Sequence, residues 1–326
     1  MSWEQELAGA YRRLEDLVAD GYLSQEEALR VQGVAKTYRF LIPKYYASLI
    51  DKRDPACPIR LQAIPQFSEE LKTDSDSPDP LGDLKHRPAL RITHRYKGRV
   101  LLHLTPNCSM YCRFCFRKSL LNELKEDLFS GGFTEAIAYI SKTIEIEEVI
   151  FSGGDPFMVG EGALQQVLSQ LAKISHLKRV RFHTRVPVTL PSRVTASFVQ
   201  ALASSRFRPV VITHFNHPRE ITPESTKAVL ELADRFIILN QSVLLRSVND
   251  NAQILGALSE QLFEMGVLPY YLHHPDPAQG TSQFYLSVEE GIGIWEAMRR
   301  ELPGYLVPRY VKDVVGEAYK RDVNSP

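Results

Sequence analysis

Three cysteines, Cys108, Cys112 and Cys115, stand close together in the run CSMYCRFC and are three of the four cysteines in the chain. The run follows the apolar segment VLLHLT, which predicts a loop at the end of a buried strand. Thiolates suit iron–sulfur clusters, so three within eight residues can ligate three irons of a [4Fe-4S] cluster. Ferredoxin-type sites close the cage with a fourth cysteine. The spacing therefore predicts a cluster whose open iron binds and activates another molecule.

Nearby cysteines have two other common uses, a disulfide with one thiol left over and a zinc site. A zinc knuckle needs a second pair of ligands at similar spacing. The remaining cysteine, Cys57, lies in DPACP without a neighbouring partner. The pattern therefore favours the cluster over both alternatives, and we expect Cys57 to be a thiol without a function.

The bulk composition is that of a soluble enzyme. The chain has 326 residues with 39 basic and 39 acidic side chains, so net charge predicts no attraction to nucleic acids or membranes. No apolar run approaches the length of a bilayer span, and the start MSWEQELAGAYRRLEDL lacks the apolar core of a signal peptide. Few cysteines, clustered rather than paired, fit a reducing compartment. We therefore expect a cytoplasmic protein.

The first ninety residues differ in pattern from the rest. Apolar residues from Trp3 to Val18 recur at helical spacing, and Ser24 followed by Glu27 has the pattern of a capping box that opens a second helix. The run TDSDSPDPLGD, residues 73–83, combines turn formers with acids and predicts a surface linker. We therefore expect a helical section with its linker over residues 1–90 and a second unit over 91–326.

Short apolar strands alternate with amphipathic helical stretches after residue 91. The expected strands are VLLHLT, EEVIFSGG, KRVRFHTR, PVVITHF, RFIILN, VLPYYLH and GYLVPRYV. Alternation of this kind predicts an α/β fold with parallel strands, and the number of strands suits a barrel or partial barrel, although periodicity alone leaves a two-layer sheet open. Barrel sites lie at the C-terminal ends of strands, where the chemically suggestive residues of this chain fall.

The run SGGDP, residues 152–156, follows the second expected strand. Its glycines allow close approach of a ligand and Asp155 adds an acceptor, but a tight strand-to-helix turn has the same composition. Together with C-x3-C-x2-C and the aromatic Phe114 before the last cysteine, the run resembles the radical S-adenosylmethionine enzymes. The resemblance implies a partial (β/α) barrel, a [4Fe-4S] cluster and S-adenosylmethionine, with Gly153, Gly154 and Asp155 at the methionine amino group.

A narrower resemblance covers residues 90–320. CSMYCR, FSGGDP, THFNHPREIT, NQSVLLRSVND and LPYYLHHPD are similar, in the same order, to motifs of the lysine 2,3-aminomutase family. That family adds pyridoxal 5'-phosphate, so the resemblance implies an isomerase, an intramolecular aminotransferase that converts L-lysine to β-lysine, with Gln241 at a cofactor. The end PGYLVPRYVKDVVGEAYK resembles the branch that supplies β-lysine for modification of elongation factor P.

Pyridoxal phosphate needs a lysine for covalent attachment, and its phosphate needs arginine forks and hydroxyl donors. The resemblance assigns Lys320 to the first task and Arg95, Tyr96 and Arg99 of HRYKGR to the second. From the residues alone, Lys320 is typical of a solvated tail and HRYKGR of a solvated basic loop before the first strand.

Three charged residues are expected to select the substrate. By the same resemblance Arg117 binds the substrate carboxylate, while Asp276 and Asp313 bind the distant ammonium of lysine. Two acids favour a cationic over an acidic side chain. From the residues alone, Asp276 is equally a turn residue before Pro277, and Asp313 a surface acid.

The resemblance also sets expectations about partners and alternatives. Lysine would be the small-molecule substrate and flavodoxin or ferredoxin the one-electron reductant, with no nucleic acid or membrane partner, and a homo-oligomer stays open. No zinc is expected, because Asn251 stands where zinc-binding relatives have cysteine. The alternatives are a 2,3-aminomutase acting on arginine or another cationic amino acid, a radical enzyme without pyridoxal phosphate, and a non-catalytic iron–sulfur redox sensor.

Overall fold

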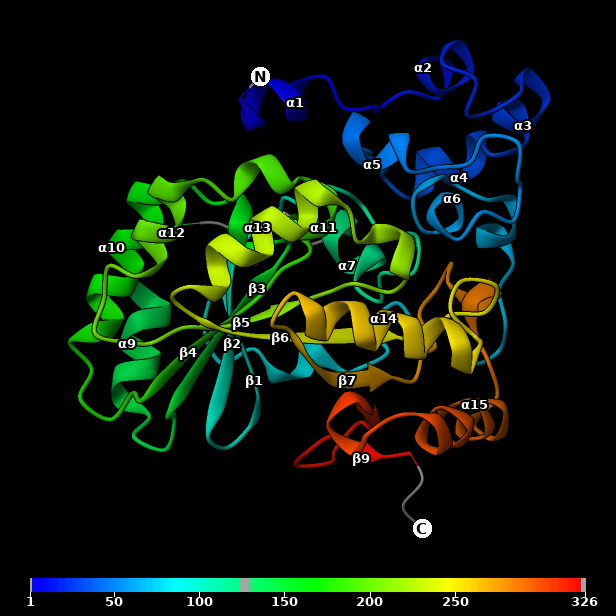
Figure 1. Cartoon of the computed structure of the whole chain (residues 1–326). Helices are drawn as coiled ribbons and strands as arrows, with labels where there is room; N and C mark the ends of the chain where they lie inside the picture. The colour runs from blue at the N-terminus through cyan, green and yellow to red at the C-terminus, as the bar shows by residue number, and fades with distance from the viewer. Residues whose placement is uncertain (1, 124–128, 130, 324–326) are drawn as a thin grey trace.

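The computed structural model describes residues 2–123, 129 and 131–323, and its centre is one curved sheet (Figure 1). The strands are hydrogen-bonded in chain order from β1 to β9. Strands β2 to β8 run parallel, whereas the edge strands β1 and β9 are antiparallel to their neighbours. The bounds are β1 (Ile92–Tyr96), β2 (Arg99–Thr105), β3 (Glu148–Gly153), β4 (Arg179–His183), β5 (Val210–Thr213), β6 (Ile237–Val243), β7 (Leu268–His273), β8 (Arg309–Lys312) and β9 (Arg321–Asp322).

Helices between the strands cover the outer face of this sheet (Figure 1). Each longer helix turns an apolar stripe inward; in α10, Leu164, Val167, Leu168 and Leu171 are buried. Among the described helices none is both long enough and apolar enough to cross a membrane. The helices are α7 (Lys118–Glu123), α9 (Thr134–Lys142), α10 (Glu161–Ala172), α11 (Val186–Thr189), α12 (Ala196–Leu202), α13 (Pro223–Ala233), α14 (Ala252–Glu264) and α15 (Val288–Glu301).

An α/β partial barrel with an N-terminal helical section was predicted, and the structure confirms it. Each predicted strand is present as one of β2 to β8. The loop predicted for HRYKGR is wrong, because its first residues complete strand β1 and Arg99 opens β2. Tyr96 pairs with Arg99 across the two-residue turn Lys97–Gly98, so the segment is a β-hairpin. The sequence did not indicate this strand, because its last three residues are polar or basic and only partly buried.

The N-terminal section is a series of short helices that lies at one end of the sheet (Figure 1). The long helix expected up to Val18 is interrupted, because Gly9 ends the first helix and Tyr11 pairs with Ile42 in an antiparallel bridge. The capping box of Ser24 and Glu27 is present, with both reciprocal hydrogen bonds. The helices are α1 (Trp3–Ala8), α2 (Leu14–Ala19), α3 (Gln25–Arg30), α4 (Gln32–Thr37), α5 (Lys44–Ser48), α6 (Pro58–Ala63) and the 3-10 turns η1 (Phe67–Glu70) and η2 (Asp83–His86).

The surface linker predicted for residues 73–83 is only partly at the surface. Residues 73–75 are exposed, but Leu81 and Asp83 are buried. The backbone amide of Ser77 donates to the carbonyl of Pro277 at 2.8 Å, so the segment is tied to the loop after β7. The boundary near residue 90 stays a prediction.

Candidate active site

The inner face of the sheet and the loops that follow its strands surround a cavity of about 450 Å³. It extends from the starts of β2 and β3, at Arg99 and Glu148, to the loops at the C-terminal ends of the strands, where a barrel fold places its site. The cavity brings together every residue singled out from the sequence as a site residue. These are Arg95, Tyr96, Arg99, Cys108, Cys112, Phe114, Cys115, Arg117, Gly153, Gly154, Asp155, Gln241, Asp276, Asp313 and Lys320.

The three cysteines lie on the loop between β2 and α7, and their thiols are free. Burial raises the pKa of the Cys108 and Cys115 thiols, because a thiolate is poorly solvated there. Within the described residues, no three His, Cys, Asp or Glu side chains converge on a single ion. A [4Fe-4S] cluster has no need of such convergence, because each cysteine ligates its own iron. The donor set therefore fits a cluster.

Gly153 and Gly154 allow the end of β3 to approach the cysteine loop. A Cβ on Gly154 would lie 2.3 Å from the carbonyl oxygen of Asn107, and one on Gly153 would lie 2.8 Å from that of Thr105. Gly153 also has a positive φ of 111°, which side chains other than glycine rarely adopt. The amides of Gly154 and Asp155 donate to the same two carbonyls, at 2.7 and 2.8 Å. The glycine pair therefore fixes the backbone that leads into Cys108.

Asp155 is buried and its carboxylate is held by protein donors. Its oxygens accept hydrogen bonds from the Thr184 hydroxyl at 2.7 Å and from the amides of Arg185 and Phe157 at 2.7 and 3.0 Å. Burial raises the pKa of Asp155, while these hydrogen bonds favour its ionised form. Its role at the methionine amino group stays a prediction.

Arg185, just after β4, was not singled out from the sequence, yet it lies against the cysteine loop. Its Nη1 is 2.8 Å from the sulfur of Cys112. Its Nη2 donates to Glu220 at 2.5 Å and to Gln62 at 2.7 Å. Burial alone lowers the pKa of a guanidinium, but Cys112, Tyr46 and Glu220 raise the pKa of Arg185, which stays a cation.

The N-terminal section holds the cysteine loop through buried ion pairs. Glu69 of η1, 1% exposed, accepts from Nε of Arg113 at 2.9 Å and also pairs with its Nη2. The Lys118 ammonium donates to Glu69 at 2.7 Å and to the carbonyl of Gly280 at 2.8 Å. Burial lowers the pKa of Lys118 to about 8 in spite of Glu69. One carboxylate thus joins residues between and after the cysteines to the helical section.

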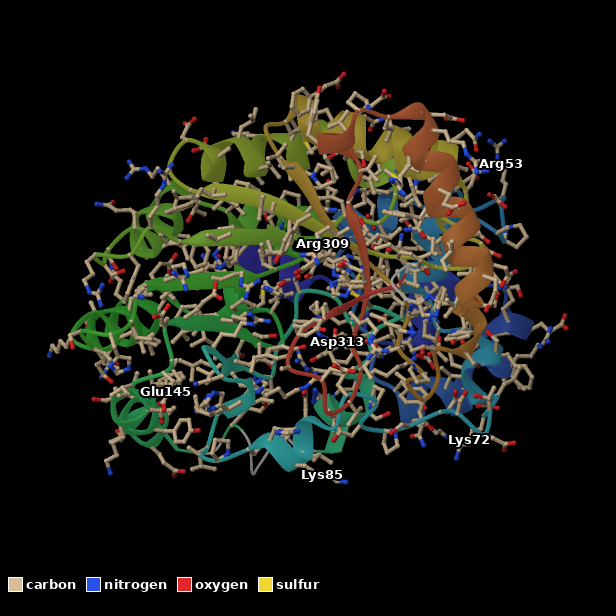
Figure 2. All side chains as sticks on the ribbon, turned by 90° about the horizontal axis from the view of Figure 1, so that it is seen from below. Arg53, Lys72, Lys85, Glu145, Arg309 and Asp313 are labelled. Carbon is tan, nitrogen blue, oxygen red and sulfur yellow. The ribbon has the colours of Figure 1, made fainter. Side chains whose placement is uncertain are left out.

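At the other side of the cavity, side chains connect the two edges of the sheet. Tyr96 of β1 donates to Oδ1 of Asp313 at 2.8 Å, and Lys320 forms an ion pair with Oδ2 of the same carboxylate. Asp313 follows β8, and its side chain is 5% exposed. Figure 2 labels Asp313 on the segment that follows β8, seen from below. Asp313 is therefore not the surface acid that the residues alone allowed.

Asp313 and Asp276 have opposite protonation tendencies. Burial raises the pKa of Asp313, but Lys320 and the Tyr96 hydrogen bond outweigh it and lower the pKa to about 2. Burial and the nearby charge of Asp313 raise the pKa of Asp276 to about 7. Among the described residues, no hydrogen-bond donor to the Asp276 carboxylate is found. Of these two acids, Asp313 is therefore paired with a cation, whereas Asp276 has no cationic partner in contact among the described residues.

Three arginines of the cavity, Arg95 and Arg99 from the β1 hairpin and Arg181 from β4, offer donors to an anion. Nη2 of Arg95 and Nε of Arg181 are buried without a hydrogen-bond partner among the described residues. The guanidinium of Arg99 lies over the ring of Tyr96, 4.3 Å from its centroid. Buried donors without acceptors are costly unless a ligand satisfies them. This set fits a phosphate such as that of pyridoxal phosphate, with Arg181 an addition that the sequence did not indicate.

Arg117 is held toward the cavity by Asp83 and Ser152. Its Nε and Nη2 donate to Oδ2 of Asp83 at 3.3 and 3.2 Å, and its Nη1 donates to the Ser152 hydroxyl at 3.0 Å. Arg95 lies 3.8 Å from the other oxygen of Asp83. Asp83 is 2% exposed but belongs to the segment predicted as a surface linker, so sequence reasoning missed it. Composition gave no signal for it.

Besides His274, three histidines at strand ends line the cavity, and the sequence assigned no role to them. His183 ends β4, His214 follows β5 and His273 ends β7. Burial lowers the pKa of all three, so their imidazoles are neutral. Nε2 of His183 and of His214 finds no partner within the described part of the chain. Each of these histidines comes at the end of an apolar run in the sequence, and this position could have indicated that its side chain lies in the site.

Residues 97–185 match a family model described as a 4Fe-4S single cluster domain. An L-lysine 2,3-aminomutase of Fusobacterium nucleatum is 39% identical over 323 residues, 98% of this chain and 76% of the relative. The enzyme of that name from Clostridium subterminale is 39% identical over 98% and 77% of the two chains. That from Escherichia coli is 34% identical over 91% and 86%.

Among solved structures, a radical SAM methyltransferase from Sphaerobacter thermophilus aligns with a TM-score of 0.48 and 16% identity over 68% of each chain. The family assignment rests on the sequence relatives, which extend over nearly the whole chain. The protein belongs to the L-lysine 2,3-aminomutase family of radical S-adenosylmethionine enzymes, isomerases that use a [4Fe-4S] cluster, as the order of its motifs predicted.

Proposed function

We propose that this chain converts L-lysine to β-lysine by 2,3-amino migration, with pyridoxal phosphate attached to Lys320. The observation that carries the proposal is a single cavity that gathers the cysteines of one loop, the arginines of the β1 hairpin and both acids near the end of the sheet. These residues span positions 95 to 320, so their convergence is a property of the fold. The names of the relatives support the substrate and the reaction.

The residues fit the groups that the reaction needs. Cys108, Cys112 and Cys115 would hold the cluster, and Arg95 and Arg99 would bind the cofactor phosphate. When bound, the cluster with S-adenosylmethionine supplies a carbon radical that removes a hydrogen atom, and pyridoxal phosphate supplies the conjugated ring for the nitrogen shift. The protein positions these groups and excludes water.

Charge placement supports a diamino acid as substrate. Arg117 donates to Asp83 and Ser152, and it would bind a substrate carboxylate by exchanging part of these contacts. Asp276 has no donor in contact among the described residues, and its ionised form would be stabilised by an ammonium group. Asp313, already paired with the Lys320 ammonium, can exchange that partner for a substrate ammonium. Two carboxylates for one distal cation favour lysine over a neutral amino acid.

The test is an anaerobic assay of the reconstituted protein with pyridoxal phosphate, S-adenosylmethionine, a strong reductant and L-lysine. Mass spectrometry of the derivatised product should show β-lysine. A β-amino acid formed from arginine but not from lysine would move the assignment to another cationic substrate. Deoxyadenosine without an aminomutase product would indicate a different radical reaction, and neither product from a protein with an intact cluster would indicate a redox sensor.

A matched pair of variants tests the attachment of pyridoxal phosphate. Lys320→Ala should abolish incorporation of the cofactor after borohydride reduction, as measured by the intact mass of the protein. Lys312→Ala, whose lysine belongs to β8 and does not line the cavity, should retain it. Labelling of Lys312 instead of Lys320 would overturn the assignment.

We further propose that the β-lysine serves the modification of elongation factor P. The support is the resemblance of PGYLVPRYVKDVVGEAYK to the branch with that role. We propose flavodoxin or ferredoxin as the electron donor, since the reaction needs one electron at low potential. Deletion of the gene should remove the β-lysine mass from elongation factor P, and an unchanged mass would refute this link.

A further inference from the structure

We infer that Arg185 is a positioning residue that makes the cluster easier to reduce by donating a charged hydrogen bond to the Cys112 sulfur. The inference rests on the proposal that Cys112 ligates a cluster. It concerns the electron-accepting step, which precedes any chemistry on the substrate. The contact of 2.8 Å between Nη1 of Arg185 and Sγ of Cys112 is the starting observation.

The guanidinium of Arg185 is held in this position from several directions. Its Nη2 donates to Glu220, Gln62 and the Tyr46 hydroxyl at 2.5, 2.7 and 3.2 Å. Its own backbone amide donates to Asp155. The side chain also lies over the ring of Phe114, 4.9 Å from the centroid. Arg185 is 7% exposed, so its guanidinium cannot turn to solvent, and its Nη1 is directed at the sulfur while Nε has no partner among the described residues.

Within the part of the chain that the structure describes, no side chain is found to donate a hydrogen bond to the other two sulfurs, and the charges of Arg117 and Lys118 lower the pKa of the Cys115 thiol without such a bond. Among the described residues, Arg185 is the side-chain donor found at a sulfur of the three cysteines. Cys108 and Cys115 face backbone amides, those of Asp155 and Arg117. Backbone amides are neutral, whereas the guanidinium carries a full charge, and hydrogen bonds to charged groups are stronger than neutral ones. The influence of Arg185 is therefore concentrated on the iron that Cys112 would ligate.

The expected effect follows from charge. Reduction adds one negative charge to the cluster, and a nearby cation in a buried site stabilises that charge. Hydrogen bonds to the sulfurs also draw electron density away from iron, and they are among the features that set the reduction potential of such clusters. Removing Arg185 should therefore make reduction less favourable.

Glu220 works against Arg185 and provides a test with the opposite sign. Its carboxylate is fully buried, accepts from Arg185 and Tyr46 through one oxygen, and accepts from the amides of Asn216 and His217 through the other. This anion offsets part of the guanidinium charge felt at the sulfur. Glu220→Gln retains the shape and an acceptor but removes the negative charge, so reduction should become more favourable.

The experiment is a redox titration of the reconstituted protein followed by electron paramagnetic resonance, in the absence of S-adenosylmethionine. Arg185→Gln should lower the equilibrium constant for one-electron reduction about tenfold, which is about 59 mV toward more negative potential. Glu220→Gln should shift the potential to the positive side. Arg193→Gln is the matched control, because Arg193 is also buried but contacts Glu161 and two backbone carbonyls, so the potential should not change.

Iron and sulfide analysis of each variant accompanies the titration. If Arg185→Gln retains a full cluster at the wild-type potential, the inference is wrong. If Arg185→Gln fails to load iron, Glu220→Gln decides: a positive shift supports the inference, and an unchanged or negative one overturns it. Shifts of the same sign in both variants would indicate a general disturbance and also overturn it. Because the readout needs no turnover, failure of the wild type to make β-lysine would refute the proposed function alone.

Discussion

Tyr96 and Asp313 are joined by a hydrogen bond of 2.8 Å between strand β1 and the segment that follows β8. Among the described residues, no backbone hydrogen bonds join the two edges of the sheet. This side-chain contact therefore connects β1 with the segment that follows β8. It also holds Asp313 beside Lys320 and beneath the arginines of the β1 hairpin. The partial barrel thus encloses its cavity with the same residues that we propose to bind the cofactor and the substrate.

Tyr96→Phe removes this contact. A hydrogen bond to a charged group contributes about 1.5–3 kcal/mol, so urea unfolding should show a loss within that range. The affinity for pyridoxal phosphate, followed by absorbance, should also fall. Tyr139→Phe is the control, because Tyr139 bonds His94 of the same strand at 2.7 Å but lies outside the cavity. It should lose about 0.5–1.5 kcal/mol and bind the cofactor normally; equal cofactor losses in both variants would contradict the assignment of Tyr96.

Glu69→Gln should release the cysteine loop from the helical section. The change leaves Arg113 and Lys118 buried without their anion, and breaking a buried ion pair costs about 3–5 kcal/mol. We expect a lower unfolding temperature and faster loss of iron to a chelator. Glu147→Gln, which breaks exposed contacts with Lys178 and Arg179, should leave both measurements unchanged. Iron retained at the wild-type rate in Glu69→Gln would show that the loop needs no such support.

Gly154→Ala should prevent cluster assembly. The added Cβ would lie 2.3 Å from the backbone oxygen of Asn107, and a backbone atom cannot move aside without shifting the cysteine loop. Gly162→Ala in α10 has open space around its Cβ and should stabilise the helix by up to about 1 kcal/mol. Iron content after reconstitution and thermal unfolding distinguish the two variants. A full cluster in Gly154→Ala would mean that the loop tolerates a different path.

The raised pKa of Asp276 predicts a pH dependence of substrate capture. With a pKa of about 7, its carboxyl is protonated below neutrality and loses the charge that would attract an ammonium group. The value of kcat/KM for lysine should therefore fall as the pH drops below 7, approaching tenfold per unit. Asp313, with a pKa of about 2, stays ionised throughout. Asp276→Asn should have low activity and should lose the decrease of kcat/KM below pH 7. If that decrease is unchanged in the variant, another group is responsible for the titration.

The sequence predicted the parallel strands well because β2 to β8 are apolar runs separated by amphipathic helices. It missed the two-residue β9 and also β1, whose first two residues are buried while the last three, His94, Arg95 and Tyr96, are polar or basic and only partly buried. The convergence of the site residues could be anticipated because parallel strands end at one side of a sheet.

Other features could not be predicted because they depend on contacts between distant segments. Asp83 looked like part of a solvated linker until the fold placed it against Arg117. Lys320 looked like a tail residue, and only the position of β9 beside β8 turns it toward Asp313. The sequence assigned no role to Arg185, or to Glu220 within the run THFNHPREIT, because their roles arise from the packing of the helical section against the ends of β4 and β5.

The contacts of Lys118 have a consequence for how the molecule matures. This ammonium connects Glu69, made before the cysteines, with Gly280, made long after them. A nascent chain that has just exposed Cys115 therefore lacks one of the partners that fix its cysteine loop. We therefore expect the loop to reach its final geometry only after most of the polypeptide has been synthesised, so that cluster insertion follows synthesis rather than accompanying it.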